Sequence, residues 1–319
     1  MPTGQVSGTR FLDPAALARI QNLSLVAKMV VQGFISGLHR STFLGRSIDF
    51  AEHRPYMPGD DIRRLDWRLF ARSDRFHVKE FEADTNANFV VAVDVSRSMD
   101  FGWRGIRKLD YARFLAGSLA AFSRAQRDRV GLGVFDHELR EFVPPSAKHL
   151  ETVLQHLARA TPPAESETRK KKASGSDLGP PLARLGAALG RRGLVAVVSD
   201  FYEPPEAVLA AFDQLRVTGH DIMAFHVLDP AEVDLDLEGI PGFDASGTRF
   251  RDLESGALLD LSPTRARDRY REAMAEHIRT LRTGLARREV DYVLTDTKTP
   301  LDFALFRYLS EREGRRRRR

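Results

Sequence analysis

The chain has 319 residues, 42% of them hydrophobic, enough to bury one large core or two modest ones. It contains no cysteine, which excludes disulfides, zinc–thiolate sites and thiol catalysis. The net charge is +5, and residues 315–319 are all arginine, so the rest of the chain is close to neutral, unlike a uniform nucleic-acid-binding face.

Residues 1–42 are expected to contain an amphipathic helix. Residues 13–38 carry an apolar stripe at helical spacing, with Asp13 suited to the cap and Pro14 to the first turn. This stripe could bind a partner or a membrane surface, but we favour packing on the core. No stretch reaches about 18 uninterrupted apolar residues, and no signal-peptide pattern opens the chain. We therefore predict a cytoplasmic protein without a membrane span.

Residues 43–86 are dense in arginine, aspartate, aromatic and turn residues, and we predict a strand-rich subdomain there. Its charges could form a structural clasp, because a guanidinium holds a carboxylate at two points. The same side chains could instead form a recognition surface, since exposed Arg, Trp and Tyr anchor interfaces. The clasp would pair Arg54, Arg63 and Arg72 with Asp60, Asp61 and Asp66, with Tyr56 and Trp67 packed on the sheet.

Residues 87–312 alternate strand and helix patterns, which predicts a mainly parallel sheet flanked by helices. Strands are expected at 88–93, 130–135, 193–200, 221–228 and 290–294, with 138–143 antiparallel to its neighbour. Helices are expected at 109–124, 150–157, 182–189, 206–216, 263–288 and 301–311. Residues 161–176 read as a linker, about 229–261 as a hairpin insertion, and 313–319 as a basic disordered tail.

Three oxygen-bearing side chains follow the first of these strands. Asp94, Ser96 and Ser98 lie in one short loop at the carboxyl edge of the predicted sheet, where open α/β folds bind ligands. A carboxylate and two hydroxyls are hard donors that suit Mg²⁺ or Mn²⁺. The alternative is that both serines only cap the following turn or helix.

Two later positions extend this pattern. Asp200 ends another apolar strand, and Ser176 lies in a loop before the helix at 182–189. The order resembles the metal-ion-dependent adhesion site of von Willebrand factor A domains. The resemblance implies a Rossmann-like fold for residues 87–312. It also implies an Mg²⁺ or Mn²⁺ site made by Asp94, Ser96, Ser98, Ser176 and Asp200. Ser176 stands where that family has threonine, and Asp177 is an alternative ligand.

The segment before the first strand narrows the resemblance. It is similar to the bacterial family filed as domain of unknown function number fifty-eight, over about residues 40–310. The resemblance implies a MoxR-type AAA+ ATPase as partner, with an adaptor role in chaperone-like assembly or maturation of a client protein. A carboxylate of the partner would complete the metal shell. The matching positions are Arg54, Tyr56, Gly59, Asp60, Arg63, Asp66, Trp67, Ala71 and Arg72.

An enzymatic reading is the alternative. Strand-end carboxylates (Asp94, Asp136, Asp200, Asp229, Asp296) with a divalent ion could support a phosphoesterase or nuclease. The sequence has no Gly-rich phosphate loop or nucleophile triad, and Ser96 stands where a dehalogenase-like phosphatase needs aspartate. We therefore favour binding over catalysis.

The basic runs at 169–172 and 315–319 could act as electrostatic arms, but we favour solvated segments. They allow at most weak peripheral membrane association, and no specific nucleic acid is expected.

Overall fold

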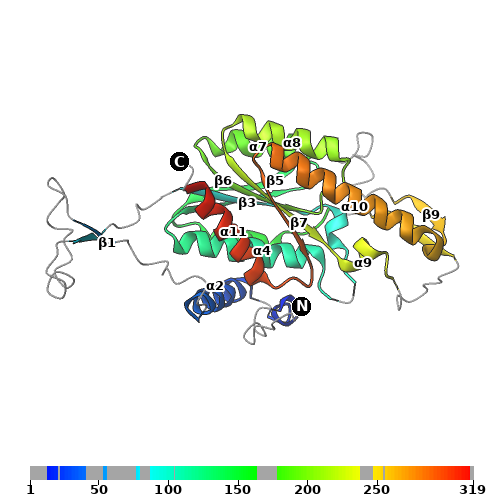
Figure 1. The fold of residues 1–319 in the computed structure, drawn as a ribbon, viewed down its shortest axis with the longest axis horizontal. Coiled ribbons are helices and arrows are strands. Elements are labelled where there is room, and N and C mark those ends of the chain that lie inside the picture. The colour runs from blue at the N-terminus through cyan, green and yellow to red at the C-terminus, as the bar shows by residue number, and fades with distance from the viewer. Residues whose placement is uncertain are drawn as a thin grey trace.

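The fold is given by a computed structural model, which describes residues 13–20, 22–40, 53–55, 77–79, 87–103, 105–163, 178–237, 247–253 and 256–316. A six-stranded sheet forms its centre, with the strand order β10–β7–β6–β3–β4–β5 (Figure 1). Only β5 runs antiparallel to its neighbour. The predicted mainly parallel α/β fold is therefore confirmed. The strands are β3 (Asn88–Asp94), β4 (Arg129–Phe135), β5 (Leu139–Ser146), β6 (Gly193–Ser199), β7 (Asp221–Leu228) and β10 (Asp291–Asp296).

The strand order creates a reversal point in the middle of the sheet. The chain builds outward from β3 through β4 to β5, then returns and places β6 on the other side of β3. The loops that follow the carboxyl ends of β3 and β6 therefore diverge. Ligands of open α/β sheets bind where strand order reverses in this way. Asp94 ends β3 and Asp200 follows β6, so both lie at this point.

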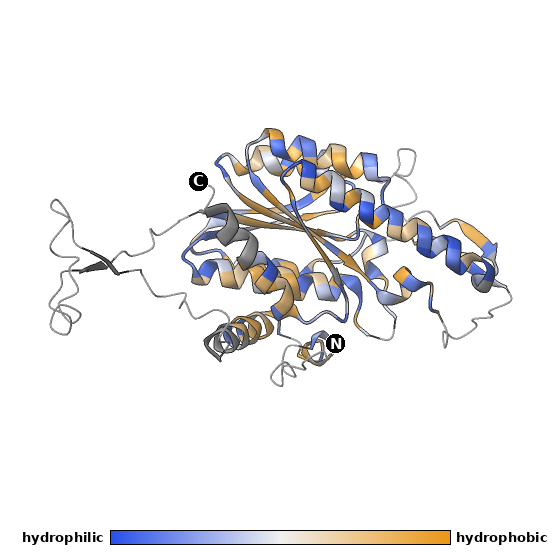
Figure 2. Cartoon of the chain, in the orientation of Figure 1, coloured by the Kyte–Doolittle hydropathy of each residue, from blue (hydrophilic) through white to orange (hydrophobic). Residues whose placement is uncertain are grey.

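Helices cover both faces of the sheet (Figure 1). One face packs against α4 (Lys108–Ala125), α5 (Leu150–Arg159) and α11 (Leu301–Arg316), and α2 (Leu23–Arg40) packs on the outside of these helices, mainly on α4. The other packs against α7 (Gly179–Leu189), α8 (Pro205–Val217) and α10 (Pro263–Arg287). The strands are continuous apolar runs because both of their faces are buried. Figure 2 shows this apolar interior beneath helices whose outer sides are polar.

The predicted helix at 13–38 is interrupted in the structure. A short helix, α1 (Pro14–Leu17), is capped by Asp13, and α2 begins only at Leu23. The break has a local cause, because the Asn22 side chain accepts a hydrogen bond from Leu25 N (3.0 Å) and starts α2 anew. The expected packing of the stripe on the core is confirmed by Val26 and Val30, which are fully buried.

The remaining elements are short. They are β1 (His53–Pro55) paired antiparallel with β2 (His77–Lys79), the 3₁₀ turn η4 (Arg97–Asp100), α9 (Pro230–Asp234), and the hairpin of β8 (Thr248–Arg251) and β9 (Leu258–Leu261). α11 continues to Arg316, into the segment where the sequence predicts a disordered tail, since Arg and Glu are good helix formers. None of the helices in the described ranges is long and apolar enough to cross a bilayer.

Much of the predicted signature subdomain lies outside the described residues. Arg54 is in β1, opposite Val78. The clasp and the recognition surface therefore both stay predictions. The positions outside the described ranges are Tyr56, Gly59, Asp60, Asp61, Arg63, Asp66, Trp67, Ala71 and Arg72.

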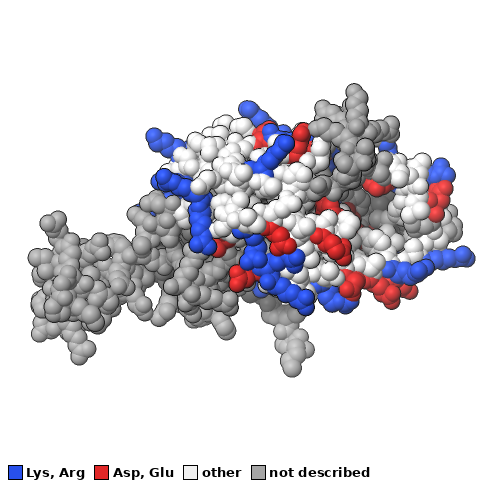
Figure 3. All heavy atoms as spheres, turned by 90° about the horizontal axis from the view of Figure 1, so that it is seen from above, with Lys and Arg blue, Asp and Glu red and all other residues white. Residues whose placement is uncertain are grey.

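Charges of both signs are interspersed on the face over α8 and α10 (Figure 3). Several form ion pairs between elements, such as Arg288 with Asp213 (2.9 Å) and Arg271 with Asp234 (2.7 Å). These exposed pairs each contribute little to stability, but they tie α10 to α8 and α9.

Candidate functional site

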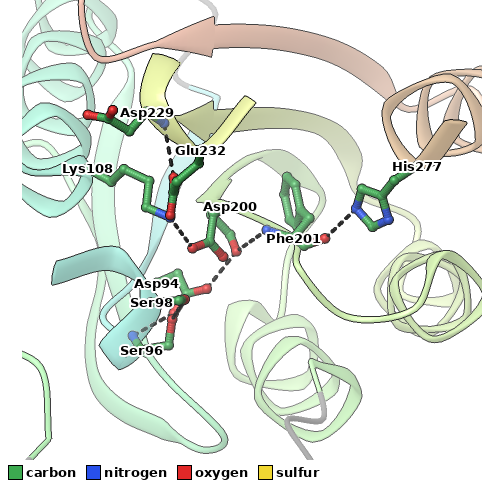
Figure 4. Close-up of polar contacts among 10 residues, drawn as sticks. Asp94, Ser96, Ser98, Lys108, Asp200, Phe201, Asp229, Glu232 and His277 are labelled. Atoms are coloured by element: carbon green, nitrogen blue, oxygen red, sulfur yellow. Dashed lines mark hydrogen bonds and ion pairs between the residues drawn. The ribbon is translucent and has the colours of Figure 1, made fainter. Parts of the chain in front are cut away.

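The loop after β3 gathers the three oxygen-bearing side chains predicted from the sequence (Figure 4). Val95 N donates to Phe135 O (2.7 Å), which holds the strand end against β4. Asp94 Oδ1 accepts a hydrogen bond from Ser96 N (2.7 Å), and this tight turn brings Ser96 Oγ to 3.0 Å from Ser98 Oγ. Ser96 precedes η4 but makes no side-chain capping bond. The capping alternative is therefore wrong for Ser96.

The turn after β6 brings the second carboxylate to the same place. Ser199 Oγ donates to Asp94 Oδ2 (2.6 Å) and accepts from Phe201 N (3.1 Å), so one hydroxyl joins both strand ends. Phe201 is buried with φ 45°, a left-handed conformation that is costly for a bulky residue. His277 Nε2 on α10 donates to Phe201 O (2.9 Å) and holds this turn. Phe201 directly follows Asp200, so these contacts hold the turn that carries Asp200.

Asp94 is a buried carboxyl group with further negative charge close to it. Burial, then the charges of Asp200 and Glu203, raise the pKa of Asp94 well above its ordinary value. Asp94 has hydrogen bonds from Ser199 and Ser96, but within the described ranges it forms no ion pair. When it is ionised, such a carboxyl group is stabilised by a cation at its side.

Lys108 is a site residue that the sequence did not reveal. It is the first residue of α4, its side chain is fully buried, and Nζ lies 2.8 Å from both Asp200 Oδ2 and Glu232 Oε1. Burial lowers the pKa of Lys108, but the two carboxylates outweigh it and raise that pKa above its ordinary value. The available signal was a lysine in a helix's first turn, where the dipole disfavours a cation.

Asp229 connects the site to the rest of the sheet edge. Its Oδ1 caps α9 by accepting from Ala231 N (2.9 Å), and its Oδ2 accepts from Trp103 N and Thr297 Oγ1 (3.1 Å each). Glu232 Oε2 accepts from Asp229 N (3.1 Å) and completes a capping box. The loop after η4, α9 and the end of β10 therefore meet at one buried carboxylate.

The other strand-end carboxylates have local structural roles. Asp136 pairs with Arg140 (2.7 Å), and Asp296 accepts hydrogen bonds from Lys298 N and Thr299 Oγ1. Across the described ranges, no three His, Cys, Asp or Glu side chains gather as a metal-binding set.

The assembled donors fit a divalent cation of the Mg²⁺ type. Asp94, Ser96, Ser98 and Asp200 lie together, whereas Ser176 and Asp177 fall outside the described residues. Each carboxylate oxygen of Asp94 accepts one hydrogen bond and has capacity for another contact. All four side chains offer oxygen donors, which are the ligands that Mg²⁺ prefers. A metal here would depend on the serine hydroxyls as well as the carboxylates.

A buried histidine packs behind the Asp200 turn. His226 on β7 has ring centroids 5.5 Å from Phe201 and 6.2 Å from His277, and its Nδ1 lies 2.6 Å from Tyr292 Oη. Burial, with a smaller effect of His277, lowers the pKa of His226 to about 3. The folded protein therefore holds this ring neutral.

We expect His226→Phe to flatten the pH dependence of stability. The unfolded chain protonates this histidine below about pH 6.5 and the native state does not, so stability falls as pH falls. The wild type should lose about 2 kcal/mol between pH 7.5 and 5 through this group, and the variant should not. Urea unfolding at both pH values measures the difference. Tyr292→Phe keeps the histidine and should keep the slope, and equal slopes in wild type and His226→Phe would contradict the assignment.

The chain resembles known proteins over most of its length. The model of one family, described as "Protein of unknown function DUF58", matches residues 52–280. Relatives include the uncharacterized proteins Rv1480 of Mycobacterium tuberculosis (strain ATCC 25618 / H37Rv) and Mb1516 of Mycobacterium bovis (strain ATCC BAA-935 / AF2122/97). Each is 30% identical over 273 residues, covering 83% of this chain and 80% of the relative.

Solved structures show looser likeness. BatB from Bacteroides thetaiotaomicron has a TM-score of 0.45 at 16% identity, over 71% of this chain and 99% of BatB. An aerotolerance-related membrane protein from Bacteroides fragilis has a TM-score of 0.45 at 18% identity, over 68% and 96%. The SpRpn10 VWA domain has a TM-score of 0.38 at 8% identity, over 69% and 93%.

Proposed function

This chain belongs to the family described as protein of unknown function DUF58, and we propose that it is a metal-dependent protein-interaction module that works with a MoxR-type AAA+ ATPase. The observation that carries the proposal is the Asp94–Ser96–Ser98 loop beside Asp200 at the reversal point of the sheet. Within the described residues Asp94 forms no ion pair, and its loop lies at a place where such sheets bind ligands.

The chain's own residues prepare the site. Ser96 N and Ser199 Oγ fix the Asp94 carboxylate, and the Ser96 and Ser98 hydroxyls lie close enough to share one ion. Asp94, Ser96 and Ser98 would hold Mg²⁺ or Mn²⁺, with Asp200 beside them. When bound, the ion would offer a coordination position to a carboxylate of a partner protein.

The surroundings of the site suit a protein partner. Tyr202 is 37% exposed, and its ring lies over the buried ammonium of Lys108, 4.6 Å from Nζ. An exposed tyrosine held in one orientation is a common anchor of interfaces, because little side-chain entropy is lost on binding. The ATPase and its client follow from the family resemblance. The cytoplasmic location and weak membrane association through residues 315–319 stay predictions.

The proposal gives the site no catalytic step. The carboxyl of Asp200 is held by Lys108, and Asp94 is assigned to the metal. A nucleophile or general base needs access to the substrate. Turnover of phosphoesters or nucleic acid with Mn²⁺, lost in Asp200→Ala, would replace the proposal with a metal-dependent hydrolase.

We expect Ser98→Ala to weaken capture of the MoxR-type ATPase from the same organism by at least about tenfold, because a metal site loses one ligand oxygen. Affinity should be measured for purified proteins at constant Mg²⁺, since a chelator would also affect the nucleotide state of the ATPase. Ser24→Ala, on α2, is the matched control and should bind as the wild type does. Equal affinity of Ser98→Ala and wild type would contradict the proposal.

A further inference from the structure

Lys108 occupies a position that is unfavourable for a lysine in two respects. Its side chain has no exposed surface, and it begins α4, where the helix dipole repels a cation. A buried charge is tolerated when carboxylates compensate it at hydrogen-bonding distance. Residues that break several preferences of their local structure are often functional, and Lys108 touches the proposed metal site directly.

The Lys108 ammonium lies at the same distance from two carboxylates. Nζ lies 2.8 Å from Asp200 Oδ2 and 2.8 Å from Glu232 Oε1 (Figure 4). The aromatic rings of Tyr202 and Phe101 lie over it, with centroids at 4.6 Å and 5.9 Å. The two carboxylates and the two rings together hold the ammonium beside Asp200 Oδ2.

The result is an uneven distribution of charge between the two strand ends. The ion pairs of Lys108 in the described structure go to Asp200 and Glu232, and Asp94 has hydrogen bonds alone. One oxygen of Asp200 is thus already bound to a cation that belongs to the chain. A divalent ion beside Asp94 would meet a carboxylate whose charge is partly neutralised, and it would be repelled by the nearby ammonium.

We propose that Lys108 is a built-in cation that competes with the metal for Asp200 and so sets the metal affinity of the site, while Glu232 relieves that competition by sharing the ammonium. Lys108 is a positioning residue in this scheme and not a ligand. The inference rests on the proposed metal site. It makes the metal, and with it the partner, reversibly bound, because the chain itself can satisfy Asp200 when the ion leaves.

The test is a double variant that keeps the total charge. Lys108→Met with Glu232→Gln removes one positive and one negative charge and retains the approximate size of both side chains. If only the summed charge mattered, Mn²⁺ affinity would not change. If Lys108 competes for Asp200, the Mn²⁺ dissociation constant should fall by about tenfold or more, comparable to what a neighbouring charge does to proton binding. Isothermal titration with Mn²⁺ on the full chain measures it.

Glu232→Gln alone keeps the test decisive if the double variant does not fold. In this variant Asp200 is, of the two carboxylates, the one left to pair with the Lys108 ammonium. The Mn²⁺ dissociation constant should therefore rise, whereas it should fall in the double variant. Unchanged or weaker binding in a folded double variant would overturn the inference, as would unchanged or tighter binding in Glu232→Gln. These outcomes, with Mn²⁺ binding intact in the wild type, leave the proposed function standing. No Mn²⁺ binding by the wild type overturns both.

Discussion

Asp94→Asn is expected to lose the entire stabilisation that Mg²⁺ gives the wild-type protein. An ion that binds only the folded state adds about 2.7 kcal/mol at about 100 times its dissociation constant, and this increment should vanish with the carboxylate charge. Without metal the variant should lose no more than about 1–2 kcal/mol of stability. An amide in place of the Asp94 carboxylate keeps the size of the side chain but only one oxygen acceptor, so the bond from Ser96 N or from Ser199 Oγ is lost, while the repulsion from Asp200 and Glu203 disappears.

The measurement is thermal unfolding of both proteins with and without Mg²⁺. Asp136→Asn is the matched control, because Asp136 also follows a strand of the sheet but pairs with Arg140, and its variant should retain the metal response. An equal response of Asp94→Asn and wild type would refute the site as assigned. A large loss of stability without metal would show instead that the Asp94 charge is structural.

Asp229→Ala is expected to destabilise the protein by about 3–5 kcal/mol, since it leaves buried donors unsatisfied at a point where separate segments meet. Trp103 N, Ala231 N and Thr297 Oγ1 would all lose their acceptor, and α9 would lose its cap. Urea unfolding gives the loss. Because the same carboxylate holds the loop after η4, hydrogen exchange should quicken there and in α9 before it does in β3.

The control for this second variant is Asp296→Ala. Asp296 is also a strand-end carboxylate, but its hydrogen bonds go to Lys298 N and Thr299 Oγ1 close by in the chain. Its removal should cost about 1 kcal/mol. A similar small loss for Asp229→Ala would mean that the three donors find water or other acceptors, and that Asp229 does not join the segments energetically.

The sequence was sufficient for the fold because its signals are local. Apolar runs such as 88–93 and 221–228 mark buried strands, and the helical periods between them mark the covering layers. The antiparallel strand after 130–135 and the family resemblance carried by residues 54–72 are also confirmed, the latter by the family match over residues 52–280. The prediction of one continuous helix over 13–38 was wrong in its middle, because the Asn22 side chain accepts a hydrogen bond from Leu25 N and begins a separate helix, α2.

The site was only partly predictable, because its remaining contacts join distant residues. Asp94, Ser96 and Ser98 are neighbours in the chain and were readable as a motif. Lys108 and Glu232 are separated by 124 positions, and their contact follows from strand order, which no local pattern states. The left-handed backbone at Phe201 has no sequence signal either, since glycine or asparagine would be expected there. Ser176 and Asp177 lie outside the described residues, so the choice between them stays a prediction.

The reversal of strand order also determines when the site can form as the chain emerges from the ribosome. β3, β4 and β5, with α4 and α5, are contiguous in the chain and can associate early around one hydrophobic face. The second neighbour of β3 is β6, and the Ser199 hydroxyl that fixes Asp94 lies 105 positions later in the chain. Glu232 and His277 are synthesised later still. The carboxylate loop is thus made early but acquires its final geometry late, and contacts of such long sequence separation are slow to form. Metal binding would then report completed synthesis of the domain and would not occur on its first half.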